Sequence, residues 1–186
     1  NIYYGGWFRK NLQLLAENSK QGYATIFGYY VRDPQRFGVV EFDRDLNVLS
    51  VEEKPEHPKS NYSITGLYFY DGRAAEMAKK LLPSKRGELE ITDLNRLYLE
   101  ENRLRVQILG RGFAWMDTGT VDSLMQAASF VEAVQNRQGV LISAPEEIAY
   151  LAGWIDRETL LLSADWYGSS PYGNHLRSVA EGRFSY

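Results

Sequence analysis

Cysteine is absent from this 186-residue chain, and histidine occurs only twice, as His57 and His175. Without cysteine there can be no disulfide framework, thiolate zinc site or cysteine nucleophile. His57 lies between two prolines in a predicted loop and His175 lies near the end of the chain, so neither a histidine metal site nor a Ser-His-Asp triad is supported. The lack of cysteine is compatible with a reducing compartment, and we expect a cytoplasmic protein.

Clustered positive charge and long apolar runs are missing too. Lys and Arg number 21 against 24 Asp and Glu, which gives a formal net charge of −3, and no basic tract is longer than two residues. Nucleic-acid and anionic-membrane surfaces rely on clustered basic side chains, so we expect neither partner. A membrane-spanning helix would need a run of about 18 apolar residues, and the sequence contains none. The 44% of hydrophobic residues is instead typical of a globular domain with its own core.

The spacing of apolar residues predicts an α/β chain whose last third is mainly helical. Residues 1–6 are typical of the end of a strand that leads into a loop. Further strands are predicted over residues 23–31, 39–43, 48–53, 63–70, 104–109 and 113–116, and helices over 7–20, 72–82, 91–101, 145–153 and 156–163. Beyond residue 167 the segment GSSPYGNH predicts a loop, and we expect the terminal residues to be poorly ordered.

The clearest helix begins at Val121. Apolar residues recur there at the spacing of one helical face, namely at Val121, Leu124, Met125, Ala128, Val131 and Val134. This spacing predicts a long helix with one apolar side.

The segment GRGFAWMDTGT, residues 110–120, is the strongest candidate for chemistry. A short apolar strand ends at Asp117, a glycine turn follows, and Thr120 can cap the helix that begins at Val121. A carboxylate at a strand end can bind Mg²⁺, and a helix N-terminus attracts phosphate through its N–H groups and dipole. The alternative is that Asp117 and Thr118 only cap the helix and stabilise the turn.

A second candidate is the segment VEEKP, residues 51–55. Neighbouring residues of a strand point to opposite faces, so only one of Glu52 and Glu53 can face a given site. Pro55 favours an extended backbone at Lys54, which would project the ammonium group into a cleft where it could meet a phosphate. The alternative is an ordinary solvated strand end.

Two further groups carry weaker signals. Lys85 and Arg86 form a cation pair in a loop, and Arg86 matters only if a phosphate has to be held by a cation as well as by metal and helix dipole. Tyr68 and Tyr70 share one face of a predicted strand and could line a sugar cleft, although packing within a half-buried sheet is the commoner explanation.

Several segments together resemble one enzyme family. The segments are RFGVVEFD (36–43), VEEKPEHPKSNY (51–62), TGLYFYD (65–71), PSKRGELEITDLNRLYLE (83–100), GRGFAWMDTGT (110–120), NRQG (136–139) and PEEIAYLAGWID (145–156). They closely resemble the bacterial glucose-1-phosphate thymidylyltransferases, also called dTDP-glucose pyrophosphorylases. The resemblance covers nearly the whole chain and thins after about Asp165.

The resemblance implies a fold and a reaction. The fold would be part of a nucleotidyltransferase, Rossmann-like mixed sheet with helices over residues 1–138, followed by a helical C-terminal region over 139–186. In the reaction, a phosphate oxygen of glucose 1-phosphate attacks the α-phosphorus of dTTP and expels pyrophosphate, leaving dTDP-glucose. Relatives supply that product for deoxysugars such as rhamnose. Mg²⁺ would be the cofactor, and Asp117 matches one of the two aspartates that hold it.

The resemblance also implies a sugar-phosphate site. The matching residues are Phe37, Gly38, Glu53, Lys54, Ile64 and Arg86. Lys54 and Arg86 match the cations that grip the sugar phosphate, and we expect them to act in catalysis. Gly38, Glu53 and Ile64 match positions around the sugar, while Phe37 stands where the family usually has tyrosine.

The sequence departs from the family most at its beginning. Asn1 matches the asparagine of a Gly-Asp-Asn step, so the second metal aspartate would precede it, and the glycine-rich nucleotide loop is not in the sequence. The resemblance therefore predicts the sugar-phosphate half of the enzyme, inactive by itself, with most dTTP contacts elsewhere. A sheet that lacks the strands of the nucleotide-binding half should expose one edge and one face, which predicts low stability or self-association.

Other interpretations remain open from the sequence. Relatives form tetramers, so we expect a homo-oligomer. The chain could instead be a non-catalytic module that binds sugar phosphates or mediates oligomerisation, or a related sugar-1-phosphate uridylyl- or cytidylyltransferase.

Overall fold

The protein is seen in a computed structural model that describes residues 1–5, 8–84 and 86–183. The chain divides into two compact units, Asn1–Asp117 and Thr118–Tyr186. Each unit has its own core and is described by itself. The family resemblance places a functional boundary after residue 138. The division into compact units does not test that boundary, which stays a prediction.

The first unit contains all the strands of the described chain. They are β1 (Ile2–Tyr4), β2 (Ala24–Tyr30), β3 (Gly38–Phe42), β4 (Val48–Glu53), β5 (Tyr62–Phe69), β6 (Leu104–Leu109) and β7 (Ala114–Met116). Its helices are α1 (Phe8–Lys20), α2 (Ala74–Ala78) and α3 (Ile91–Glu100), with a 3₁₀ turn η1 (Pro34–Arg36) before β3. Each predicted strand and helix of this unit is confirmed, with α2 shorter at both ends than predicted, while Trp7 lies outside the described residues.

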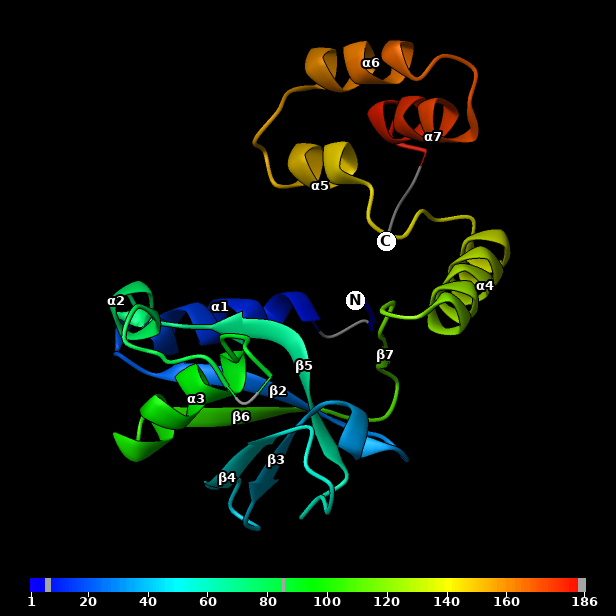
Figure 1. The fold of residues 1–186 in the computed structure, drawn as a ribbon. Helices are drawn as coiled ribbons and strands as arrows, with labels where there is room; N and C mark the ends of the chain where they lie inside the picture. The colour runs from blue at the N-terminus through cyan, green and yellow to red at the C-terminus, as the bar shows by residue number, and fades with distance from the viewer. Residues whose placement is uncertain (6–7, 85, 184–186) are drawn as a thin grey trace. The chain divides into compact units, whose positions relative to one another are not determined.

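Five strands form a mixed sheet in the order β4-β3-β5-β2-β6 (Figure 1). Strand β2 lies between β5 and β6, antiparallel to β5 and parallel to β6, and β3 runs antiparallel to both β4 and β5. Strands β1 and β7 pair separately as an antiparallel ribbon in which Ile2 lies opposite Met116. The α/β class and the mixed sheet are therefore as predicted.

Helices cover both faces of the sheet because alternate residues of β2 point to opposite sides. On one side Ile26 packs with Leu94 and Tyr98 of α3. On the other side Phe27 packs with Leu15 of α1. The expectation of an uncovered sheet face is thus wrong around Phe27, since α1 fills that side. Among the described strands, β4 and β6 are the two edges of the sheet.

The second unit is helical. Its helices are α4 (Val121–Gln138), α5 (Pro145–Leu151), α6 (Arg157–Trp166) and α7 (Pro171–Ala180). Thr120 caps α4 as predicted, since its hydroxyl accepts a hydrogen bond from the Ser123 amide at 3.1 Å. Gly139 ends the helix in the left-handed conformation, with φ of 70°. No helix in the described ranges is long and apolar enough to cross a membrane.

The N-terminal half of the apolar side of α4 is exposed in the structure. Val121, Leu124 and Met125 have relative exposures of 78%, 54% and 63%, and the buried residue of α4 is Ala127. The predicted helix is confirmed, but the first half of its apolar face is exposed, whereas Val131 and Val134 further along the face are half-buried.

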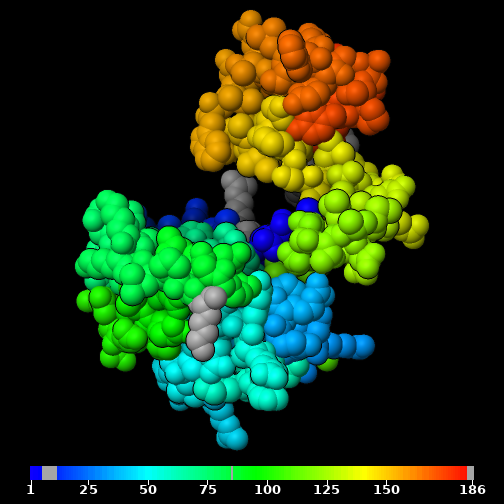
Figure 2. Space-filling view, viewed as in Figure 1, coloured from blue at the N-terminus to red at the C-terminus, as the bar shows by residue number. Residues whose placement is uncertain are grey.

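Helix α7 lies where the sequence predicted a loop. Gly and Pro read as loop residues, yet Pro171 occupies the first helical turn, where proline is tolerated, and Ser170 caps the helix by accepting from the Gly173 amide at 3.1 Å. Leu176 is fully buried against Leu160 of α6. Figure 2 shows α6 and α7, in orange, as one compact body. Tertiary packing therefore stabilises a helix whose local composition is unfavourable. Of the terminal residues expected to be poorly ordered, 184–186 lie outside the described ranges.

The cap of α7 provides a test of this helix. Replacing Ser170 by alanine removes the acceptor for the Gly173 amide and should cost about 1 kcal/mol. Amide hydrogen exchange should show this loss as reduced protection of the α7 amides. Ser169→Ala is the matched control, because that exposed side chain does not cap the helix. Equal protection of the α7 amides in the two variants would contradict this account of the cap.

Candidate functional site

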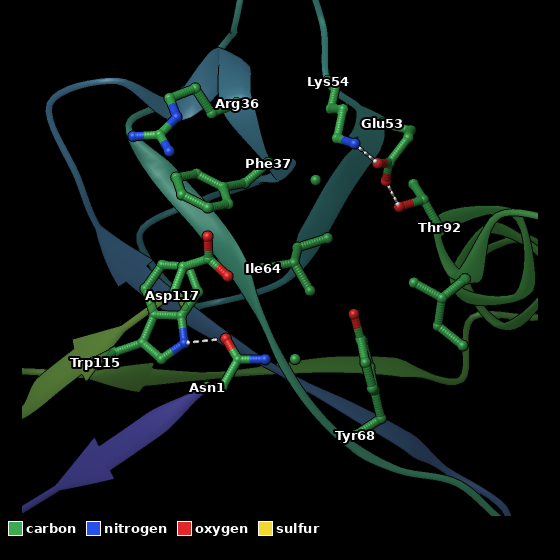
Figure 3. Close-up of a pocket in the computed structure, with 13 residues that line it drawn as sticks. Asn1, Arg36, Phe37, Glu53, Lys54, Ile64, Tyr68, Thr92, Trp115 and Asp117 are labelled. Atoms are coloured by element: carbon green, nitrogen blue, oxygen red, sulfur yellow. Dashed lines mark hydrogen bonds and ion pairs between the residues drawn. The ribbon is translucent and has the colours of Figure 1, made fainter. Parts of the chain in front are cut away.

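A pocket of about 280 Å³ lies in the first unit (Figure 3). This volume is near the lower limit of about 300 Å³ for small-ligand pockets and suits a ligand of monosaccharide size. Six of the predicted site residues line it, namely Phe37, Gly38, Glu53, Lys54, Ile64 and Asp117. The start of β3, the end of β4, the middle of β5 and the end of β7 supply them. Residues far apart in the sequence are thus brought together at one side of the sheet.

Glu53 faces this pocket and Glu52 does not. The Glu52 carboxylate pairs with the Lys59 ammonium at 2.7 Å, outside the lining of the pocket. Glu53 instead lies directly opposite Gly38 in the β3–β4 ladder, and its Oε2 accepts a hydrogen bond from the Thr92 hydroxyl at 2.6 Å. Strand alternation therefore separates the two acids as predicted.

Gly38 has little free space beside it. A Cβ atom at this position would lie 3.1 Å from Oγ1 of Thr92 and 3.3 Å from Oε2 of Glu53. An alanine here would push apart the two partners of the Thr92–Glu53 hydrogen bond. The close packing of β3 on α3 therefore leaves little room for a side chain where the sequence predicted a substrate-binding residue.

Lys54 differs from its predicted conformation. Its φ is 42°, in the left-handed region, rather than extended. Its amide donates a hydrogen bond to the Phe37 carbonyl at 3.1 Å, which continues the β3–β4 pairing by one residue and holds this backbone. Proline disfavours the right-handed helical region for the residue before it, and Lys54 avoids that region by taking the left-handed conformation. The Nζ atom still reaches the pocket, 4.0 Å from Oε1 of Glu53.

Arg86 lies beside the pocket rather than in its lining. Its Nη2 atom is 3.9 Å from Oε1 of Glu53 and forms closer bonds with Glu88 and Glu90, at 3.0 and 2.9 Å. These contacts hold the pKa of the Arg86 guanidinium above its usual value, first through the hydrogen bond to Glu90. Lys85, its predicted partner in the cation pair, lies outside the described residues.

Asp117 lies on the side of the pocket formed by aromatic rings. Phe37 and Trp115 meet edge to face with ring centroids 5.2 Å apart, and the Trp115 indole donates to Oδ1 of Asn1 at 3.0 Å. Figure 3 shows the Asp117 carboxylate near these rings, with Glu53 and Lys54 across the pocket.

One carboxylate by itself can contribute to a Mg²⁺ site, because this ion commonly takes one or two carboxylates together with waters and phosphate oxygens. The described ranges contain no group of three or more His, Asp or Glu side chains placed to hold a metal. The donor chemistry of Asp117 therefore fits a partial site for a hard divalent cation.

The two tyrosines of β5 have different roles. Tyr68 lines the pocket, and Figure 3 shows its hydroxyl directed into the space. Burial, with a further contribution from the negative charge of Glu53, raises the pKa of Tyr68 to about 12, so it remains a neutral hydrogen-bond donor near neutrality. Tyr70 packs underneath and donates to Oδ1 of Asn95 at 2.6 Å.

Sequence reasoning missed Thr92 and the role of Glu90. Thr92 is fully buried and reaches Glu53 from a position 39 residues away. Glu90 lies just before a predicted helix, where an acidic residue needs no further explanation because the helix dipole favours it. The available signal was a hydroxyl on the inner side of a predicted helix, which by itself does not identify a partner.

Comparisons with known proteins agree on one family. A family model described as nucleotidyl transferase matches residues 1–134. The chain is 56% identical over 176 residues to a glucose-1-phosphate thymidylyltransferase of Neisseria gonorrhoeae, which covers 95% of the chain and 60% of that relative. It is 51% identical to the Xanthomonas campestris protein of the same name and 48% to the Mycobacterium tuberculosis one, in each case with 97% of the chain covered. The chain spans about 60% of the length of these relatives.

Solved structures show the same fold. A Bacillus anthracis structure, named as a glucose-1-phosphate thymidylyltransferase and solved with sucrose, matches with a TM-score of 0.60 and 37% identity, covering 69% of this chain and 50% of that one. A UDP-glucose pyrophosphorylase in complex with UDP-glucose matches with a TM-score of 0.57 at 20% identity, covering 67% of this chain and 49% of that one. The second likeness concerns the fold alone.

Proposed function

Since this chain belongs to the nucleotidyl transferase family, we propose that it provides the sugar-phosphate side of a glucose-1-phosphate thymidylyltransferase site. The observation that carries the proposal is one pocket that holds a carboxylate, an ammonium and a second carboxylate, from Glu53, Lys54 and Asp117. An interaction module would not need this set of charges around a monosaccharide-sized space. The identity to named thymidylyltransferases supports the choice of glucose 1-phosphate and dTTP as substrates.

The residues of the pocket suit the two parts of the sugar phosphate. Glu53 can accept hydrogen bonds from sugar hydroxyls, and the Thr92 hydroxyl fixes one of its oxygens. Lys54 and Arg86 can donate charge-assisted hydrogen bonds to the phosphate, which are stronger than hydrogen bonds between neutral groups. Phe37 and Trp115 form an apolar wall next to Asp117. Held in this way, a phosphate oxygen would attack the α-phosphorus of dTTP, forming a new P–O bond while the bond to pyrophosphate breaks.

Phosphoryl transfer depends on position and charge neutralisation more than on acid-base groups, which agrees with a pocket built from cations and carboxylates. Asp117 would be a ligand of Mg²⁺, which would neutralise phosphate charge when bound. The remaining ligands would be phosphate oxygens, waters and groups outside this chain. Lys54 in the pocket and Arg86 beside it would orient the sugar phosphate before the reaction.

The proposal predicts that the chain binds glucose 1-phosphate through Lys54. Replacing Lys54 by methionine keeps most of the side-chain volume and removes the charge, so the dissociation constant should rise about tenfold or more. Isothermal titration calorimetry with glucose 1-phosphate measures this directly. Lys59→Met is the matched control, because Lys59 pairs with Glu52 away from the pocket. The proposed function is wrong if wild-type chain does not bind glucose 1-phosphate, or if both variants bind it as wild type does.

We further propose that the chain functions in a homo-oligomer. The exposed apolar residues Val121, Leu124 and Met125 of α4 support this, because contiguous exposed apolar residues commonly mark protein contacts. Sedimentation equilibrium should show self-association, and purely monomeric behaviour would contradict it.

A further inference from the structure

Glu90 forms hydrogen bonds along one edge of the Arg86 guanidinium. Its Oε1 accepts from Nε at 3.2 Å and from Nη2 at 2.9 Å, and its Oε2 accepts from Nη2 at 3.1 Å. The Ser84 hydroxyl donates to the same carboxylate at 2.8 Å. Glu90 is nearly buried, with 8% relative exposure, whereas the Arg86 side chain is 45% exposed. A buried, anchored acid thus fixes an exposed and otherwise flexible cation.

Glu90 is not used to cap its own helix. It occupies the N-cap position of α3, but its side chain makes no capping hydrogen bond there. The carboxylate turns instead to the loop that carries Ser84 and Arg86. The pKa of Glu90 is held below its usual value, first by the hydrogen bond from Arg86 and then by that from Ser84, with a smaller effect from the charge of Lys54. The acid is therefore ionised and electrostatically linked to both cations beside the pocket.

The contact leaves part of Arg86 for a ligand. Every hydrogen bond and ion pair that the Arg86 guanidinium forms with the described residues uses Nε or Nη2, and none of those residues bonds to Nη1. The same Nη2 lies 3.9 Å from Oε1 of Glu53, which places the guanidinium at the edge of the pocket. A guanidinium has donors on several edges, so it can bind a carboxylate with one edge and a phosphate oxygen with another.

We propose that Glu90 is a positioning residue, which holds the Nε–Nη2 edge of Arg86 so that Nη1 is presented to the phosphate of the sugar substrate. This inference rests on the proposed function, in which Arg86 binds that phosphate. The effect arises before binding. An arginine already fixed by a buried carboxylate loses less side-chain freedom when the ligand arrives, so more of the interaction appears as affinity.

The test compares Glu90→Gln with Glu88→Gln in the full chain. Both changes remove one carboxylate that bonds to Nη2 of Arg86, but Glu88 is 66% exposed and contacts one nitrogen only, and exposed pairs contribute little. Glu90→Gln should weaken glucose 1-phosphate binding about tenfold by calorimetry, while Glu88→Gln stays within about twofold of wild type. Glu90→Asp, which keeps the charge, should recover part of the loss.

A double-mutant cycle separates positioning from a general structural effect. If Glu90 acts through Arg86, Glu90→Gln has little further effect in the Arg86→Ala background. In wild-type chain, NMR should show a slowly exchanging Nε–H of Arg86, and this protection should be lost in Glu90→Gln but not in Glu88→Gln.

The outcomes distinguish the two proposals. Wild-type affinity in Glu90→Gln, or an equal loss with and without Arg86, overturns the positioning role while leaving the proposed function intact. Absence of glucose 1-phosphate binding by wild type contradicts the proposed function, and the inference falls with it.

Discussion

Nucleotidyl transfer should fall by about 10²–10³-fold when Asp117 is replaced by asparagine, because a metal-bound carboxylate contributes several kcal/mol of charge stabilisation to the transition state. Asparagine keeps the shape of the side chain, so the aromatic wall of Phe37 and Trp115 should remain. The measurement is pyrophosphate release from dTTP and glucose 1-phosphate with Mg²⁺. It is made with the chain alone and with the chain combined with the part of the Neisseria gonorrhoeae relative that it does not match.

The control for this change is Asp45→Asn, which removes the same charge from an exposed turn of the first unit. It should turn over at the wild-type rate. An Asp117→Asn chain that keeps wild-type turnover would contradict the metal-binding role, and no turnover by wild type in either mixture would contradict the proposed activity itself.

The second large effect is expected from Gly173→Val in α7. A Cβ atom at Gly173 would lie 2.5 Å from the Gly168 carbonyl oxygen and 2.9 Å from that of Ala164. Both atoms belong to the backbone, so no side-chain rotation can relieve the overlap. We expect a loss of about 3 kcal/mol in the free energy of unfolding of the helical unit. Amide hydrogen exchange measures this loss, as reduced protection of the α6 and α7 amides.

Gly72→Val is the matched control, because a Cβ atom there meets no atom within 4 Å. This variant should keep wild-type protection in α6 and α7. Because the chain has two compact units, a single melting temperature would not report on the helical unit alone. Unchanged protection in Gly173→Val would show that α7 can move away from α6 at little cost.

The strands could be predicted because they depend on local patterns, whereas most residues of the pocket were predicted from the family resemblance. Alternation along β4 separated Glu52 from Glu53, and the family resemblance selected the residues at the strand ends that line the pocket. Their roles in binding and catalysis stay predictions, since geometry alone does not test them.

Other features depend on contacts that a linear pattern does not contain. Helix α7 is stabilised by the burial of Leu176 against α6, which overrides its glycine and proline. The left-handed backbone of Lys54 follows from one hydrogen bond across the β3–β4 pair. The apolar side of α4 was visible in the sequence, but its exposure was not, because periodicity indicates a face and not what covers it.

The pairing of strands that are far apart in the sequence limits how early the first unit can fold during synthesis. Strand β2 aligns Ala24 with Leu104 of β6, and β1 aligns Ile2 with Met116 of β7. Contacts so far apart along a chain form slowly, since long loops must close first. Asn1 and Asp117 both line the pocket, so during synthesis it cannot form until almost the entire unit has left the ribosome. Until then, the strands that wait for these partners keep backbone groups and apolar side chains exposed to solvent.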